Sequence, residues 1–274
     1  MQAVLDMSGK IVIVTGGTQG VGRGISQRFL ELGAEVVVCS RREPELLPAS
    51  GSRRAVFVAT DVRDMEQIDR AVALAVERFG RIDVLVNNAG GSPPAEAATA
   101  SPRFSAAVIT LNLIAPLNFA QRANAVMQRQ ETGGSIVNIA SVSGMRPSPG
   151  TAAYGAAKAG LVNLTQSLAV EWAPRVRVNA ISAGMIRTEQ TELHYGDARA
   201  VERVSQTVPL GRLGEPEDVA DACVFFASPL ARYVSGANLL LHGAGERPAF
   251  LGAREAEEPA LTAPQREDAG VPST

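Results

Sequence analysis

The chain has 274 residues, of which 46% are hydrophobic and 20% charged, with a formal net charge of −2. This length and hydrophobic content suit one large core, so we expect a single domain over residues 1–250. The balance of charge excludes a basic face for nucleic acid, and no apolar run approaches the ~18 residues that cross a bilayer. Residues 1–10 lack the basic start and apolar core of a signal peptide. We therefore expect a soluble, cytoplasmic protein without nucleic-acid or membrane partners.

A glycine-rich turn follows the first predicted strand, residues 10–15, and precedes a helical stretch from Arg23 to Leu32. Glycines let the backbone approach a diphosphate closely, and free N–H groups at the start of a helix attract anions. The spacing is not G-x-G-x-x-G, so an ordinary tight loop stays an alternative. The pattern predicts phosphate binding by Gly16, Thr18, Gln19, Gly20, Val21 and Gly22.

The second predicted strand, residues 35–39, is followed by Ser40, Arg41 and Arg42. An acidic residue at this point bonds the ribose 2′-OH of NAD, whereas a small residue followed by arginine leaves room and charge for the 2′-phosphate of NADP. The pattern favours NADP(H), with NAD(H) possible. The alternative is that both arginines are ordinary loop charges.

Two further polar motifs follow strands. Asp61 and Val62 come after the strand at 55–59, and Asn87-Asn88-Ala89-Gly90 comes after the strand at 82–86. Ligands of doubly wound sheets bind at the carboxyl ends of parallel strands, where such groups suit contacts to adenine and ribose. Either motif alone also fits a turn or a helix cap.

Tyr154 and Lys158 lie four residues apart in a predicted helix from Ala152 to Trp172, so they share one face. A tyrosine is a poor base at neutral pH, but a fixed positive charge nearby favours the phenolate and lowers its pKa. The pair therefore suits proton transfer. Taken alone, it also fits a packed tyrosine and a solvated lysine.

Further strands near 134–140, 175–181 and 237–241 complete an alternation of strands and helices. This alternation predicts an α/β, Rossmann-like, doubly wound parallel sheet of about seven strands, in the order 3-2-1-4-5 extended by the last two. The polar and helical residues 184–214 interrupt the rhythm, and we interpret this lid segment as a substrate lid. Residues 251–274 lack an apolar face, which indicates a disordered tail or, alternatively, one that packs across a neighbouring subunit.

Taken together, these motifs resemble the short-chain dehydrogenase/reductase family, in its single-domain branch. The likeness is carried by Thr15-Gly16-x-x-x-Gly20-x-Gly22, Asp61-Val62, Asn87-Asn88-Ala89-Gly90, Asn112, Ser141 and Tyr154-x-x-x-Lys158. One departure is Ala183, which stands where the family usually has the proline of a Pro-Gly pair. The resemblance implies catalysis by Asn112, Ser141, Tyr154 and Lys158, and cofactor contacts from Asn88, Ala89, Gly90, Tyr154, Lys158, Gly184, Met185, Ile186 and Thr188.

The implied reaction is hydride transfer between a nicotinamide and a carbonyl or secondary alcohol. Tyr154 would act as general acid or base, Ser141 would orient the carbonyl, with Ser143 as its rival, and Asn112 would hold a water. The candidate substrate residues are Ser143, Met145, Arg146, His194 and Tyr195. No metal site is expected, because His194 and His242 have no ligand-spaced partners.

Val170 occupies a position where relatives that reduce carrier-bound thioesters present a basic residue. This favours a small or alicyclic ketone, or a 3-oxoacyl or 3-hydroxyacyl thioester of coenzyme A. Two other functions stay as alternatives. A nucleotide-sugar epimerase or dehydratase uses the same tyrosine pair but resembles a longer chain. A catalytically silent dinucleotide sensor could lose the tyrosine pair, which is present here. The long helical stretches at 101–129 and 152–172 carry apolar residues on more than one face, and the resemblance implies that a symmetry mate buries them. We therefore expect a homotetramer, with a dimer next.

Overall fold

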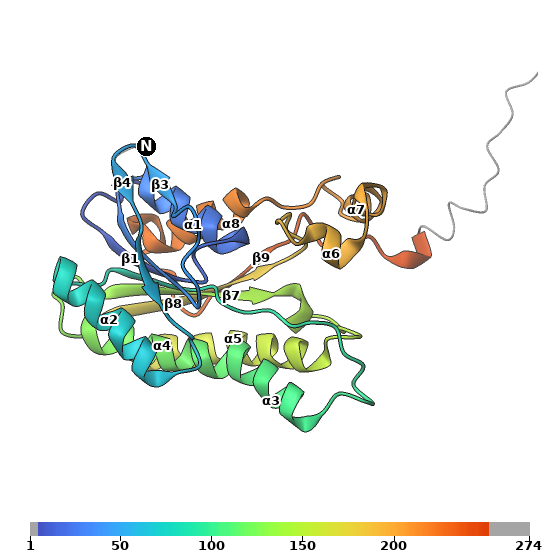
Figure 1. Ribbon diagram of the computed structural model, residues 1–274, viewed down its shortest axis with the longest axis horizontal. Coiled ribbons are helices and arrows are strands. Elements are labelled where there is room, and N and C mark those ends of the chain that lie inside the picture. Colours follow the sequence, from blue (N-terminus) through green and yellow to red (C-terminus); the bar gives the residue numbers. More distant parts are fainter. Residues whose placement is uncertain (1–4, 252–274) are drawn as a thin grey trace, which may run out of the picture.

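The computed structural model describes residues 5–251, in which seven strands form one parallel sheet (Figure 1). Along the sheet the strands run β5-β2-β1-β6-β7-β8-β9, which confirms the predicted order. All the neighbouring strands pair in parallel. Their bounds are β1 Ile11–Thr15, β2 Glu35–Ser40, β5 Val56–Ala59, β6 Val84–Asn87, β7 Gly134–Ser141, β8 Val176–Ala183 and β9 Asn238–Leu241.

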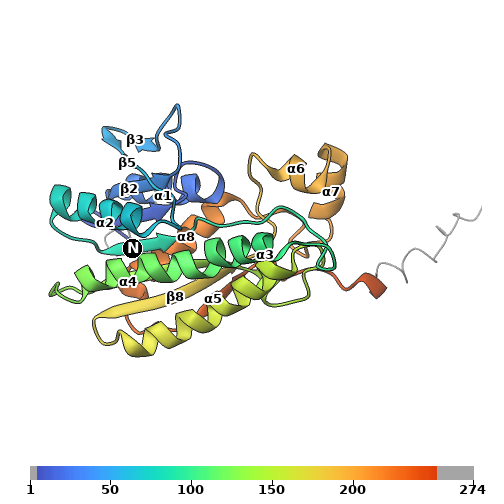
Figure 2. The same cartoon turned by 60° about the horizontal axis from the view of Figure 1, so that its bottom comes forward.

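Helices cover both faces of this sheet. Helices α1 (Gly20–Glu31) and α8 (Pro216–Ala227) pack together on one face, and α2 (Met65–Phe79), α4 (Ala115–Met127) and α5 (Ala152–Glu171) cover the other (Figures 1 and 2). A large apolar core lies on each face, because a doubly wound sheet is buried on both sides, and a smaller cluster around Leu161 adds to them.

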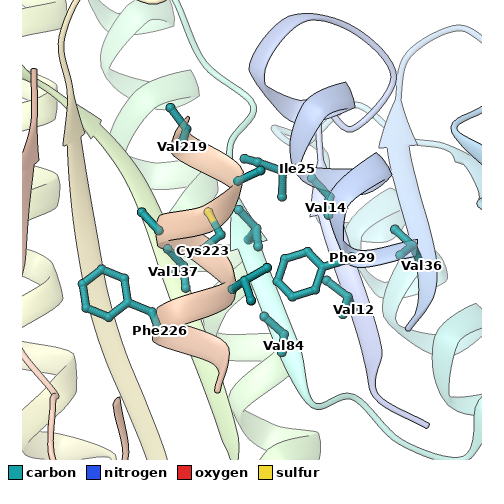
Figure 3. Close-up of a cluster of buried hydrophobic side chains, with 14 of the residues drawn as sticks. Val12, Val14, Ile25, Phe29, Val36, Val84, Val137, Val219, Cys223 and Phe226 are labelled. Atoms are coloured by element: carbon teal, nitrogen blue, oxygen red, sulfur yellow. The ribbon is translucent and has the colours of Figure 1, made fainter. Parts of the chain in front are cut away.

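In the core under α1 and α8, residues from early and late in the sequence pack against the sheet (Figure 3). Phe29 of α1 and Phe226 of α8 are buried against valines of β1, β6 and β7. Cys223 lies in this core and Cys39 in the other, and burial raises the pKa of the Cys39 thiol to about 12. Both free thiols therefore act as small apolar side chains.

The predicted helix at 101–129 is divided into three parts. A π-helical turn, η2 (Thr110–Ile114), separates α3 (Pro102–Ile109) from α4. The whole stretch Pro102–Met127 is long and apolar enough to span a membrane by length and composition alone, which corrects the expectation of no such run. Here it packs against α5 and α2, and core helices of soluble proteins pass the same test.

The lid segment leaves the carboxyl end of β8 and contains two short helices, α6 (Thr191–Tyr195) and α7 (Ala198–Ser205). They stand together beyond one end of the sheet (Figure 1). A bridge between Ile186 and Gly214 closes the base of the segment. The sequence did not predict the small hairpin β3 (Ala49–Ser50) and β4 (Arg53–Arg54) or the short helices η3 (Val142–Gly144) and η4 (Pro229–Ala231). The predicted tail lies outside the described residues beyond Leu251.

Candidate active site

The glycine turn after β1 is built for close backbone approach. A Cβ atom at Gly22 would lie 2.1 Å from the carbonyl oxygen of Gly16, whose own φ is +65°. The Asn88 side chain locks this turn, since its amide donates to the carbonyl oxygens of Thr15 (2.9 Å) and Gly16 (3.3 Å). Thr15 in turn accepts hydrogen bonds from the backbone N–H groups of Asn88 and Ala89. The turn is therefore fixed before any ligand arrives.

The start of α1 has the chemistry of an anion site. Its N-cap residue, Gln19, makes no capping hydrogen bond with its side chain, and no acidic residue stands in the first turn. The Gly20 N–H instead donates to the carboxylate of Glu189, which comes from the lid segment. A helix N-terminus that bonds a carboxylate can bond a phosphate in the same way. The crowded glycines and this N-terminus together fit a dinucleotide diphosphate.

A cavity of about 200 Å³ continues from the turn past the ends of β2 and β5. Ser40, Arg41, Asp61 and Val62 line it as the sequence suggested. Arg63 also lines it and pairs with the Asp61 carboxylate (2.5 Å); this hydrogen bond holds the pKa of Asp61 below its usual value. Arg63 was not predicted from the sequence, although its place two residues after Asp61 was a usable signal.

Three predicted cofactor residues, Thr18, Arg42 and Met185, do not line the cavities around the turn. Arg42 is exposed, and its backbone carbonyl accepts a hydrogen bond from the Ser40 hydroxyl (2.6 Å). Thr18 is half-buried within the turn but does not face the cavity. Arg41 and Arg63 are thus the guanidinium groups that line this end of the site among the described residues.

The candidate catalytic side chains meet in a neighbouring cavity of about 330 Å³. Ser141 ends β7, and its hydroxyl is hydrogen-bonded to the phenol of Tyr154 on α5. Ser143 lies outside this lining; its backbone N–H donates to Ser141 Oγ (3.1 Å), so the geometry favours Ser141 over its rival. The predicted residues that line this cavity are Gly16, Gln19, Gly20, Val21, Gly22, Asn88, Ala89, Gly90, Ser141, Tyr154, Lys158, Gly184, Ile186, Thr188 and Tyr195.

Lys158 lies over the ring of Tyr154. Its ammonium is 5.6 Å from the Tyr154 ring centroid and donates to the Ile139 carbonyl oxygen (2.7 Å). Burial lowers the pKa of Lys158 to about 8. Burial also raises the pKa of Tyr154, against the smaller lowering effect of its bond to Ser141. Removal of the phenol from water thus dominates the pKa of Tyr154 in this structure, and the lowering of that pKa by Lys158 stays a prediction.

Asn112 is fully buried in the π-helical turn, behind the cavity wall. Its amide donates to the carbonyl oxygens of Gly91 and Val108 (2.9 Å each), and its oxygen accepts from the Gly91 N–H (2.8 Å). A Cβ atom at Gly90 would lie 2.6 Å from the Asn112 oxygen and 3.2 Å from Lys158 Nζ. Asn112 thus holds the backbone that separates it from Lys158, while its predicted water-holding role stays a prediction.

A second cavity, of about 430 Å³, joins the catalytic one at Gly184. Met145, Arg146 and Met185 line it, together with His242 and Glu246, which were not predicted from the sequence. Arg146 forms an ion pair with Glu246, 100 residues downstream. Tyr195 lines the catalytic cavity: burial raises the pKa of its phenol, Glu246 raises it further, and Arg146 lowers it. His194 belongs to α6, and its side chain lies outside the described part.

The candidate active site is identified by the chemistry of its lining residues and not by the volume of its cavity. A cavity of about 520 Å³ lies between the lid segment and β9, lined by Val208, Leu210 and Leu240 among others. None of the four candidate catalytic residues lines it. Among residues 5–251, no group of three or more His, Cys, Asp or Glu side chains is arranged to hold a metal ion.

Known proteins resemble this chain over most of its length. The profile of the family described as "Enoyl-(Acyl carrier protein) reductase" matches residues 16–243. The L-rhamnose 1-dehydrogenase (NAD(P)(+)) of Azotobacter vinelandii is 37% identical over 245 residues, which cover 85% of this chain and 95% of that protein. The 3-oxoacyl-[acyl-carrier-protein] reductase FabG of Thermotoga maritima is 37% identical over 240 residues, which cover 84% and 95% of the two chains.

A solved structure agrees with these relatives. The ligand-free aldohexose dehydrogenase of Thermoplasma acidophilum superposes with a TM-score of 0.81 at 28% sequence identity. The superposition covers 96% of this chain and 100% of the other. This chain therefore has the same architecture as that dehydrogenase over almost its whole length.

Proposed function

Because the chain belongs to the short-chain dehydrogenase/reductase family and is an NAD(P)-dependent oxidoreductase acting on CH–OH groups, we propose that it interconverts a ketone and a secondary alcohol with NADP(H). The proposed substrate is a small or alicyclic ketone, or a 3-oxoacyl or 3-hydroxyacyl thioester. The observation that carries this proposal is the hydrogen-bonded pair of Ser141 and Tyr154 in one cavity with Lys158 and the glycine turn.

Tyr154 is the proposed proton donor in reduction. Its O–H bond breaks as the substrate carbonyl oxygen takes the proton, and the carbonyl carbon gains a hydride, which the bound nicotinamide supplies. The raised pKa of Tyr154 keeps the phenol protonated at neutral pH, which is the form that reduction requires. Oxidation reverses the transfer and needs the phenolate. Ser141 hydrogen-bonds the same carbonyl oxygen and so orients it beside the phenol.

The proposed preference for NADP(H) rests on charge at the end of β2. Arg41 and Arg63 line this cavity, and the one carboxylate among its lining residues, Asp61, is paired with Arg63. A 2′-phosphate would thus meet guanidinium groups and a neutralised carboxylate. NADPH should bind at least ~10-fold more tightly than NADH, and Arg41→Ala should narrow this ratio. Calorimetric titration checks both; tighter binding of NADH by the wild type contradicts the preference.

The substrate cavity has mixed character. Met145, Met185 and Leu240 supply apolar walls, and Arg146 with Glu246 supplies a compensated ion pair. Val170 is 80% exposed and has no charge with which to attract the acidic surface of a carrier protein. These features favour a free ketone or a coenzyme A thioester over a carrier-bound chain.

We also propose a cytoplasmic homotetramer, with a dimer as the next choice. Apolar side chains that a monomer leaves in water gather near β9 and α8, including Tyr233 (100% exposed), Leu230 (53%) and Leu239 (39%). On the predicted interface of α3 and α4, Ile109 and Ile114 are also exposed. Burial of such patches between copies is favourable. Light scattering at micromolar concentration should give a mass of four or two chains; a monomer mass contradicts the proposal.

The activity is tested by following NADPH absorbance with acetoacetyl-CoA, a cyclic ketone and an acyl-carrier-protein thioester. At least one of the first two should be turned over, and Tyr154→Phe serves as the control for background oxidation. NADPH binding without turnover across a wider ketone panel would favour a silent dinucleotide sensor. A carrier thioester preferred by more than ~10-fold, at rates that fall as salt rises, would overturn the substrate class.

A further inference from the structure

A carboxylate of the lid segment occupies the anion position of the glycine turn. The Gly20 N–H donates to both oxygens of Glu189, at 3.1 and 3.4 Å, across 169 residues of sequence. The neighbouring Thr188 side chain packs on the same spot, with its methyl group 3.4 Å from the Cβ position of Gly20. Thr188 and Glu189 also line the catalytic cavity with Tyr154.

Helix α1 depends on this distant partner, unlike the two acid-capped helices beside the sheet. Asp64 caps α2 from the adjacent position, and Glu215 with Asp218 forms a capping box at the start of α8. Helix α1 has no acidic residue in its first turn and no capping bond from Gln19. Its N-terminal N–H groups are left for an anion, and in this structure a carboxylate takes one of them.

We propose that Glu189 competes with the cofactor diphosphate for the glycine turn and latches the lid segment there when no cofactor is bound. The inference rests on the proposed use of this turn for a dinucleotide. One N–H group cannot serve a carboxylate and a phosphate at full strength, and the two anions repel each other at this distance. Glu189 therefore leaves the turn as the diphosphate arrives, and it returns as the diphosphate departs.

The latch has two consequences. The free protein must first release Glu189, so the apparent affinity for the cofactor falls in proportion to the unlatched fraction. The returning carboxylate also speeds dissociation of the spent cofactor, a step that often limits turnover in enzymes with lids. Glu189 thus lowers the affinity for the cofactor and speeds its exchange.

Fluorescence titration with NADPH tests the competition. Glu189→Gln removes the charge and keeps the shape, so its Kd should fall about 3- to 10-fold and its dissociation rate in stopped flow should fall with it. Glu192→Gln is the matched control, because Glu192 is an exposed carboxylate of α6 without a bond to the turn. An unchanged or higher Kd for Glu189→Gln overturns the proposal.

Limited proteolysis of the cofactor-free protein tests the latch independently of binding. Trypsin should cut after Arg199, an exposed lid residue, at least ~3-fold faster in Glu189→Gln than in the wild type or Glu192→Gln. Equal cutting rates overturn the latch. A wild-type protein that binds neither NADPH nor NADH would overturn the proposed function, whereas the proteolysis result would still decide the latch.

Discussion

The glycine turn and the lid segment face each other across one cavity but are held in different ways. All five residues of β1 are buried, and buried or half-buried side chains such as Thr15 and Asn88 fix the turn that follows it. The lid segment has two short helices and leaves Leu193 82% exposed and Leu210 69% exposed. Its links to the rest of the protein include the polar bonds of Glu189 to Gly20 and of Arg187 to Glu215.

This contrast indicates that the glycine turn and the lid segment have different roles. A surface packed into the core keeps one geometry and can preorganise a cofactor and a proton donor. A segment held by exposed polar bonds opens at low cost, because water or a ligand replaces each bond. Substitutions beside the glycine turn should therefore impair function strongly, whereas substitutions in the lid segment should have smaller effects. Four measurements test that contrast.

The largest expected difference is between two tyrosines on opposite walls. Tyr154→Phe deletes the proposed proton donor on the rigid side and should lower kcat at least ~10²-fold with the NADPH Kd nearly unchanged. Tyr195→Phe changes the lid side and should lower kcat by less than ~10-fold. Steady-state kinetics with a common ketone measures both. Retention of a tenth of wild-type turnover by Tyr154→Phe would remove Tyr154 from the mechanism.

Substitution of two glycines compares the close-packed glycine turn with the open lid segment. Gly22→Ala places a methyl group 2.1 Å from the Gly16 carbonyl oxygen, so the NADPH Kd should rise at least ~10-fold. Gly211→Ala places it in open space in the lid segment, where the cost is the φ of +71°, about 1 kcal/mol of folding free energy. Its Kd should not change. Similar NADPH affinities for the two variants would contradict the rigid-turn interpretation.

The functional charge of Lys158 lowers the stability of the folded protein, because the ammonium is buried beside the rigid glycine turn. Its folded-state pKa of about 8 lies below the ordinary 10.5, so between these pH values the unfolded chain binds more protons and wild-type stability rises with pH. Lys158→Met removes the buried charge and should raise the unfolding free energy at pH 7 by about 1–3 kcal/mol, a gain that shrinks toward pH 10. Urea unfolding at both pH values checks this. A variant less stable than the wild type at pH 7 would refute it.

The smallest expected effect concerns the ion pair at the substrate cavity. Glu246→Gln frees the Arg146 guanidinium, so KM for a carboxylate-bearing ketone should fall about 3- to 10-fold, while KM for its neutral ester stays the same. Glu217→Gln, an exposed carboxylate of α8, is the control. Equal changes for both ketones would mean that Arg146 does not face the substrate.

The sheet order, the helix layers and the positions of the glycine turn and the Tyr154–Lys158 pair could all be predicted from the amino-acid sequence. Strand alternation, helical periodicity and turn chemistry are local properties, since each depends on residues a few positions apart. The π-helical turn at Asn112 escaped prediction, because it depends on bonds to Gly91, 21 residues away.

Which side chains meet across the site depends on how distant segments of the chain fold together. Glu189 reaches Gly20, Glu246 reaches Arg146, and both pairs join segments more than 90 residues apart. The raised pKa of Tyr154 is likewise an effect of the tertiary structure, because burial of the phenol is its largest cause. Burial is a sum over the whole fold, whereas spacing along a helix shows only the nearest charges.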